Sequence, residues 1–166
     1  LENTPVFENS HRKEAANEVG CLGEVVFEAF LNHHGINYSD ERNLTSHDYT
    51  VGNKLSLDVK TKDRTVIPKI GYDNSVPIYN HEHQRVDYYY FISLLRDKNI
   101  DPSDIRRFTN AYILGGISRE LLHKHGIVWK AGDVDSRNGT KFWTDCINVS
   151  MGDLIENRKM LEILQL

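Results

Sequence analysis

The sequence has few cysteines, few prolines and no long apolar run. Its 166 residues include 2 cysteines, Cys21 and Cys146, and 4 prolines. Two cysteines do not form the disulfide framework of a small secreted domain, so we expect a reducing, cytoplasmic location. No apolar run approaches the ~20 residues that a membrane-spanning helix requires, and no secretory signal is recognisable. The sequence therefore predicts a protein without a membrane partner.

Positive charge is also in deficit. The chain has 20 Lys plus Arg against 24 Asp plus Glu, a net charge of −4. This balance argues against a basic coat that binds nucleic acid over the whole surface, but it is compatible with a local basic patch. Hydrophobic residues make up 39% of the chain and charged residues 27%, which is typical of a folded globular protein. The length and the lack of a linker predict one domain over residues 1–166.

Residues 48–62 carry the most informative pattern of the chain. From residue 54 to residue 62 polar and apolar side chains alternate, which predicts a half-buried strand. Its apolar side chains are expected to face a core, and its polar side chains to point outward. The apolar set is Leu55, Leu57 and Val59, and the polar set is Ser56, Asp58, Lys60 and Lys62. Residues 48–51 form a shorter predicted strand, and Gly52 and Asn53 are typical turn residues.

The register of this hairpin decides which side chains lie opposite each other. A two-residue turn would put Tyr49 and Val51 on the polar face, whereas pairing Val51 with Leu55 puts both on the apolar face. We therefore predict the second register, with a three-residue connection and a bulge. Asp48 then lies directly across from Asp58, with their Cβ atoms ~5 Å apart.

Asp48, Asp58 and Lys60 together indicate a metal-dependent hydrolytic site. Two carboxylates at this separation repel each other unless a cation lies between them. Oxygen ligands with room for water suit Mg²⁺ or Mn²⁺ rather than zinc. Lys60 lies on the same face as Asp58, where it can orient or deprotonate an attacking water, or offset charge on a pentavalent phosphorus. The alternative interpretation is a solvated polar strand face with a salt bridge.

An amphipathic helix is predicted before this hairpin, from about Ser10 to His34. Apolar side chains recur along it at helical spacing. They are Ala15, Val19, Leu22, Val26 and Phe30. Gly20 and Gly23 precede Glu24, and each costs ~1 kcal/mol relative to alanine inside a helix. We interpret these glycines as positions where another part of the molecule approaches the backbone closely, beside a third acidic residue.

This combination resembles the PD-(D/E)XK nucleases, the restriction-endonuclease-like superfamily. The shared pattern is Gly-x-x-Gly-Glu on a helix, an Asp on a strand, a short hairpin, and Asp-x-Lys on the next strand. It falls on Glu24, Asp48, Asp58 and Lys60, and the resemblance covers roughly residues 10–116. The resemblance implies an α/β fold with a restriction-endonuclease-like core. An N-terminal helix and a mixed central sheet flanked by helices would be followed by a C-terminal hairpin and helix.

The resemblance also implies an activity and a role for each residue. It implies a Mg²⁺-dependent deoxyribonuclease, with Mn²⁺ able to substitute, that hydrolyses phosphodiester bonds with a metal-activated water. Asp48, Asp58 and the Val59 carbonyl would bind the ion. Glu24 would bind a second ion or a metal-bound water, and Lys60 would position the nucleophile. DNA is the implied partner, a homodimer is compatible with cutting both strands, and the small size favours a phage or mobile element as the source.

The rest of the chain is predicted to complete and cover the sheet. Residues 87–95 and 109–116 read as the next two strands, and residues 119–125 as a short helix capped by Ser118. Asn138-Gly139 indicates a hairpin. Residues 141–149 are predicted as a strand and residues 151–164 as a helix.

Residues 62–85 form a long segment with little pattern, typical of a functional or solvated loop. Its candidate substrate-binding side chains are Lys62, Arg64, Lys69, Gln84 and Arg85. Basic and aromatic side chains in such a segment can follow a phosphate backbone and stack on bases. Arg106 and Arg107 form a second small basic spot. His81 and His83 do not favour zinc, because no cysteine or third histidine follows at ligand spacing.

Three functions remain open from the sequence. The first is a DNA endonuclease. The second is an exonuclease, because the spacing of Gln84 and Tyr88 is similar to that of the lambda-exonuclease-like branch. The third is a nucleic-acid-binding module that has the same fold without catalysis.

Overall fold

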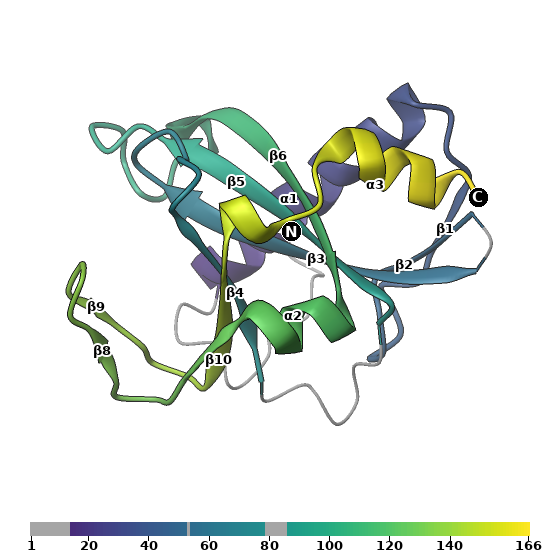
Figure 1. Ribbon diagram of the computed structural model, residues 1–166. Helices are drawn as coiled ribbons and strands as arrows, with labels where there is room; N and C mark the ends of the chain where they lie inside the picture. Colours follow the sequence, from purple (N-terminus) through teal and green to yellow (C-terminus); the bar gives the residue numbers. More distant parts are fainter. Residues whose placement is uncertain (1–13, 53, 79–85) are drawn as a thin grey trace.

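The computed structural model describes residues 14–52, 54–78 and 86–166, and it has mixed α/β architecture (Figure 1). A five-stranded sheet has the order β1 (Tyr38–Asp40), β2 (Tyr49–Val51), β3 (Leu55–Arg64), β5 (Tyr88–Arg96) and β6 (Phe108–Ser118). A three-stranded sheet has the order β4 (Asp73–Pro77), β10 (Cys146–Ser150) and β7 (Ile127–Trp129), and β8 (Val134–Asp135) pairs with β9 (Thr140–Lys141). The helical segments are α1 (Glu14–His33), η1 (Ile105–Arg107), α2 (Arg119–His125), η2 (Met151–Asp153) and α3 (Asn157–Leu164).

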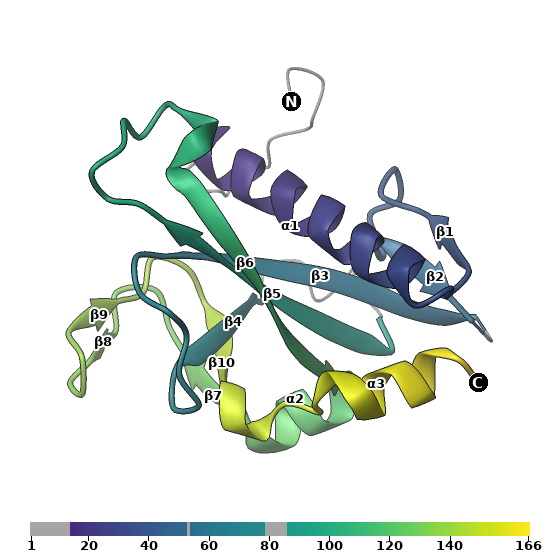
Figure 2. The ribbon, with the colours of Figure 1, turned by 90° about the horizontal axis from the view of Figure 1, so that it is seen from above.

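The larger sheet is mixed and separates two layers of packing. Strands β3 and β5 are parallel, while the other pairings of this sheet are antiparallel. Figure 2 shows α1 on one side of this sheet, with α2 and the smaller sheet on the other, while the buried side chains of α3, Met160 and Leu164, belong to the same cluster as α1. Tyr90 and Ile92 of β5 join the cluster that includes Phe27 of α1, whereas Tyr89 and Phe91 join the opposite cluster. Strand β5 is therefore buried on both faces, as residues 87–95 predicted.

The predicted register of the hairpin is confirmed. Val51 pairs with Leu55 and Tyr49 with Leu57, so the apolar side chains of β2 and β3 face α1 together. Gly52 has a φ of 55° and Lys54 a φ of 71°, so the connection turns through the left-handed region on both sides of residue 53. Extending the ladder by one residue places Asp48 opposite Asp58.

The two helix glycines differ in what surrounds them. A Cβ at Gly23 would lie 1.8 Å from Thr61 Oγ1 and 2.7 Å from two other Thr61 atoms, so α1 and β3 touch at this point. A Cβ at Gly20 would meet nothing within 4 Å. The prediction of a close approach is right for Gly23 and wrong for Gly20. The predicted helix start near Ser10 lies outside the described residues, and the end is confirmed at His33, ahead of Gly35 with a φ of 65°.

The sequence predicts that the polar face of β3 points toward solvent, and the structure shows that this prediction is wrong. Asp58 is 2% exposed, and Ser56, Lys60 and Lys62 are only partly exposed. The smaller sheet approaches this face, because residues 73–77 form β4, which pairs with β10 along its whole length (Figure 2). Residues 73–77, which belong to the segment predicted as a loop, therefore form a strand.

The predicted basic spot at Arg106 and Arg107 is also incorrect. Arg106 is exposed and pairs with Asp104. Arg107 is 4% exposed, lies 4.2 Å from the Phe108 ring centroid and forms a 2.5 Å ion pair with Glu18 of α1. This arginine ties η1 to the helix and is not available to a ligand.

The C-terminal part departs from prediction at two places. Residues 142–145 divide the predicted strand into β9 and β10, because Phe142 turns inward to stack on Trp129. The predicted helix 151–164 is divided into η2 and α3, because Ile155 exchanges two backbone hydrogen bonds with Gly116 of β6, of 2.7 and 3.0 Å. The hairpin predicted at Asn138-Gly139 and the helix capped by Ser118 are confirmed.

In the described part of the chain, no helix combines the length and the apolar character needed to cross a membrane.

Candidate active site

Three of the four predicted catalytic residues meet at one end of the β2–β3 hairpin. Asp48 immediately precedes β2, and its Oδ2 accepts a 2.8 Å hydrogen bond from the backbone N–H of Val59. Asp58 and Lys60 lie on β3 on the face away from α1, and Lys60 Nζ forms an ion pair with Asp58 Oδ2. Apart from that ion pair, the buried Asp58 Oδ2 accepts no hydrogen bond within the described part of the chain.

The two carboxyl groups of Asp48 and Asp58 are strongly coupled. Burial raises the pKa of Asp48 to about 8, with further contributions from the charge of Asp58 and a hydrogen bond between the two carboxyl groups. The Val59 N–H and Lys60 act in the opposite direction but do not cancel these effects. At neutral pH and without a cation, the pair is therefore expected to share a proton, as closely placed carboxylates do.

Lys60 is held in its charged form. Burial by itself lowers the pKa of Lys60, but attraction to Asp58 and Asp48 outweighs it, so the pKa lies above its ordinary value. The side chain is 19% exposed and lines a groove in the surface. The arrangement suits a fixed positive charge at the edge of the carboxylate pair rather than a base that accepts a proton.

Tyr89 belongs to this cluster although the sequence analysis did not select it. It pairs with Asp58 in the parallel ladder of β3 and β5, and its buried hydroxyl has no hydrogen-bond partner in the described part. Burial raises its pKa, while the charge of Lys60 lowers it. In the sequence, Tyr89 is hidden in an aromatic run that predicts only a packed strand.

Glu24, the fourth predicted residue, is held by an arginine that the sequence analysis also missed. Arg42 Nη1 donates a 2.9 Å hydrogen bond to Glu24 Oε2, and Arg42 also forms ion pairs with Asp40 and Glu28. Burial raises the pKa of Glu24, Arg42 lowers it, and the charge of Asp58 raises it further. Glu24 is therefore within electrostatic reach of the carboxylate pair, but its direct partner is Arg42.

The carboxylate pair has the chemistry to hold a hard divalent cation. Among the described residues, no group of three His, Cys, Asp or Glu side chains converges as a metal site. Asp48 and Asp58 nevertheless fit Mg²⁺ or Mn²⁺, because a cation between them would replace the shared proton and would meet the hard carboxylate oxygens that these ions prefer.

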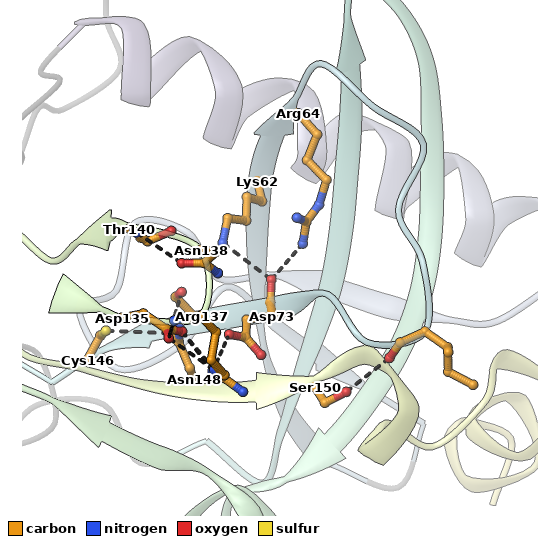
Figure 3. A network of polar contacts seen from close by, with 12 residues as sticks. Lys62, Arg64, Asp73, Asp135, Arg137, Asn138, Thr140, Cys146, Asn148 and Ser150 are labelled. Carbon is orange, nitrogen blue, oxygen red and sulfur yellow. Dashed lines mark hydrogen bonds and ion pairs between the residues drawn. The ribbon is translucent and has the colours of Figure 1, made fainter.

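A groove of about 910 Å³ extends from Lys60 along β3, and we call it the basic groove. Lys62 and Arg64 of β3 line one wall, and the β8–β9 hairpin contributes Arg137, Lys141 and nearby Trp143. Figure 3 shows Lys62 and Arg64 reaching toward Asp73 of β4, whose backbone oxygen accepts hydrogen bonds of 3.3 and 2.6 Å from them.

The other predicted substrate-binding residues are not brought to this groove. Lys69 is exposed and lies outside its lining. Gln84 and Arg85, together with His81 and His83, lie outside the described residues. The hairpin residues Arg137, Lys141 and Trp143 were missed because β8 and β9 are separated from β3 by more than sixty positions in the sequence.

No protein-family model matches this sequence, and no protein of curated function shows significant similarity to it.

Proposed function

We propose that this protein is a Mg²⁺-dependent DNA endonuclease of the PD-(D/E)XK type. The observation that carries the proposal is the buried Asp48–Asp58 pair with Lys60 beside it on the same strand face. Two acids in close contact, of which Asp48 has a raised pKa, are costly for a purely structural strand, and such groups concentrate at functional sites. The helix, the mixed sheet and the position of the acids on one hairpin support a restriction-endonuclease-like core.

Each residue has a role that follows from its surroundings. Asp48 and Asp58 would hold Mg²⁺ or Mn²⁺, with the Val59 carbonyl as a further ligand. The ion would lower the pKa of a bound water, so that this water could lose a proton and attack phosphorus. Asp48 must lose its proton for this binding, so the ion and the proton compete. Lys60, whose raised pKa keeps it protonated, would stabilise negative charge on the phosphoryl oxygens and orient the nucleophile. Glu24 would bind a metal-bound water or a second ion.

The reaction is the hydrolysis of a phosphodiester bond. The attacking water loses one proton to solvent as its oxygen forms a bond to phosphorus. The bond between phosphorus and the leaving oxygen breaks, and the leaving oxygen takes up one proton from solvent. The carboxylate pair and Lys60 lie on the same side of β3, so both can face one phosphate.

Cleavage assays with two substrates test the proposal. Supercoiled plasmid and linear DNA are incubated with Mg²⁺, Mn²⁺ or chelator, using the wild type, Asp58→Ala, Lys60→Ala and the exposed control Lys98→Ala. Nicking by the wild type and the control in metal, with at least a hundredfold loss in both site variants, is expected. Full activity in chelator or in either site variant contradicts the assignment, and DNA binding without cleavage in Mn²⁺ favours a non-catalytic module.

The same assay separates the two enzyme classes. An endonuclease converts the covalently closed plasmid to the nicked or linear form, whereas an exonuclease leaves it intact and degrades only the linear DNA. Circular dichroism of each variant establishes that a loss of cleavage does not reflect unfolding.

A further inference from the structure

The basic groove concentrates positive charge in a chain that is acidic overall. Five cationic side chains and three carboxylates line it, a local excess of +2 against a net charge of −4 for the whole chain. Two of these carboxylates, Asp73 and Asp135, contact Arg137, and the third, Asp63, contacts Arg96. This excess of positive charge favours the binding of a polyanion in the groove.

The cations of β3 lie in a row along the strand. Lys60, Lys62 and Arg64 occupy alternate positions on one strand, so the row extends over roughly 13 Å at a rise of about 3.3 Å per residue. Arg64 is oriented by the Ser93 hydroxyl at 3.0 Å, by the Asp73 carbonyl at 2.6 Å and by the Tyr72 ring. Because these hydrogen-bond partners are uncharged, they fix the guanidinium without neutralising it. A row of this kind suits the regularly spaced phosphates of one strand.

The opposite wall presents an aromatic surface. Phe142 stacks on Trp129 with centroids 4.7 Å apart and planes 12° from parallel, which anchors the end of the hairpin. The next residue, Trp143, is 63% exposed, and Lys141 Nζ lies 5.1 Å from its ring centroid. An exposed tryptophan beside a lysine is a suitable platform for an unpaired base with its phosphate nearby.

The size of the groove limits what it can hold. Its volume of about 910 Å³ lies within the roughly 300–1,000 Å³ of clefts that enclose small ligands. Such a volume is enough to enclose a few nucleotides of one strand, whereas a duplex would be enclosed only in part. We propose that the basic groove binds an unpaired, single-stranded DNA segment, with one base stacked on Trp143 and its phosphates along β3.

This inference rests on the proposed function, since the groove leads to Lys60 and would guide an unpaired strand to the carboxylate pair. The nuclease would then act on DNA that contains single-stranded or frayed segments rather than on uniform duplex. A duplex partner is the competing possibility, and direct binding distinguishes the two.

Fluorescence anisotropy in chelator measures binding without cleavage. The probes are labelled oligothymidine of about 12 nucleotides, within the site sizes of single-strand binders, and a duplex of the same length. The proteins are the wild type, Trp143→Ala, Trp143→Tyr, Lys141→Ala and the exposed control Lys159→Ala. Trp143→Ala is expected to bind the single strand about five- to hundredfold more weakly, and Trp143→Tyr to retain most of the affinity because it keeps an aromatic face.

The salt dependence gives a second readout. Loss of one phosphate contact in Lys141→Ala is expected to reduce the slope of log affinity against log salt by about 0.7, whereas Lys159→Ala leaves it unchanged. Tighter binding of the duplex, or equal single-strand affinity in the wild type and Trp143→Ala, overturns the inference. Cleavage is measured separately, so single-strand binding without metal-dependent cleavage contradicts the nuclease proposal while the groove assignment stands.

Discussion

The backbone N–H of Val59 donates a 2.8 Å hydrogen bond to Oδ2 of Asp48, across the β2–β3 hairpin. The backbone N–H of Asp48 in turn donates a 3.0 Å hydrogen bond to the Leu57 carbonyl. Asp48 is thus bonded to the residues on either side of Asp58. The separation of the two acids therefore follows from the backbone register and not from flexible side chains, which is the kind of preorganisation that a catalytic pair requires.

The coupling of the acids predicts an unusual dependence of stability on pH in the metal-free protein. The pKa of Asp48 is raised from 3.8 to about 8, so the folded protein holds one more proton than the unfolded chain between these values. This contribution is complete below about pH 4 and is lost as the pH rises through about 8. Urea denaturation in chelator should show that the free energy of unfolding falls with pH between these limits, by up to about 1.4 kcal/mol per unit.

Asp48→Asn isolates this effect. The variant keeps an oxygen for the Val59 N–H but has no proton to lose, so its stability should vary less with pH than that of the wild type. The other ionisable side chains are the same in both proteins, so their contributions cancel in the comparison. Parallel stability profiles for the two proteins would show that the carboxyl groups are not coupled.

The Asp58–Lys60 ion pair predicts a second stability effect. Lys60→Met keeps the length of the side chain but removes its charge, which leaves Asp58 buried without a cation. Removing one partner of a buried pair typically costs about 3–5 kcal/mol, and the 19% exposure of Lys60 places this pair at the lower end. Asp58→Asn combined with Lys60→Met should recover most of the lost free energy of unfolding. A double variant as unstable as Lys60→Met alone would contradict this account.

The register of the site could be predicted from the sequence, and the structure explains why. Tyr49, Val51 and Leu57 can all be buried in one alternation only, so burial selects the pairing that sets Asp48 opposite Asp58. The identities of the acids and of Lys60 are visible for the same reason, since they lie within 13 positions of each other in the sequence.

The surroundings of the site could not be predicted in this way. Strand β4, whose Asp73 carbonyl contacts Lys62 and Arg64 of β3, pairs with β10, whose residues lie about seventy positions further along the chain. Arg42 contacts Glu24 across a separation of 18 positions in the sequence. No local sequence pattern encodes such contacts. The sequence therefore predicts a solvated polar face for β3 and a surface position for Arg107, and both predictions are wrong.

Gly23 positions Glu24 and predicts a strong effect of a small substitution. In Gly23→Ala the new methyl group would overlap Thr61, which is packed between α1 and β3, so the helix must shift away from the sheet. Overpacking of this kind typically costs about 1–3 kcal/mol. Thermal or urea denaturation should show that loss, and the proposed nuclease activity should fall as well because Glu24 moves with the helix.

Gly20→Ala is the matched control in the same helix. Its methyl group meets no atom within 4 Å, so the substitution should stabilise the protein by up to about 1 kcal/mol through helix propensity alone. If both alanine variants changed stability in the same direction, the contact between Gly23 and Thr61 would not be the cause.

The Arg42–Glu24 ion pair is expected to lower the affinity of the site for a metal ion. Arg42 occupies the Glu24 carboxylate and places a positive charge near the proposed ion. The Arg42 and Glu24 side chains are 34% and 22% exposed, so this ion pair contributes little more free energy than an ion pair on the surface. Arg42→Ala should therefore lower the dissociation constant for Mn²⁺ by about two- to fivefold, measured by isothermal titration calorimetry.

Arg106→Ala removes an arginine paired with Asp104 on the surface and should leave the Mn²⁺ affinity unchanged. Weaker Mn²⁺ binding in Arg42→Ala would mean that the guanidinium orients Glu24 for the ion rather than competing with it. The two roles have opposite effects on Mn²⁺ affinity, because competition by Arg42 removes Glu24 as a ligand, whereas orientation by Arg42 supplies it. The direction of the change in affinity thus decides whether Glu24 takes part in metal binding only after Arg42 releases it.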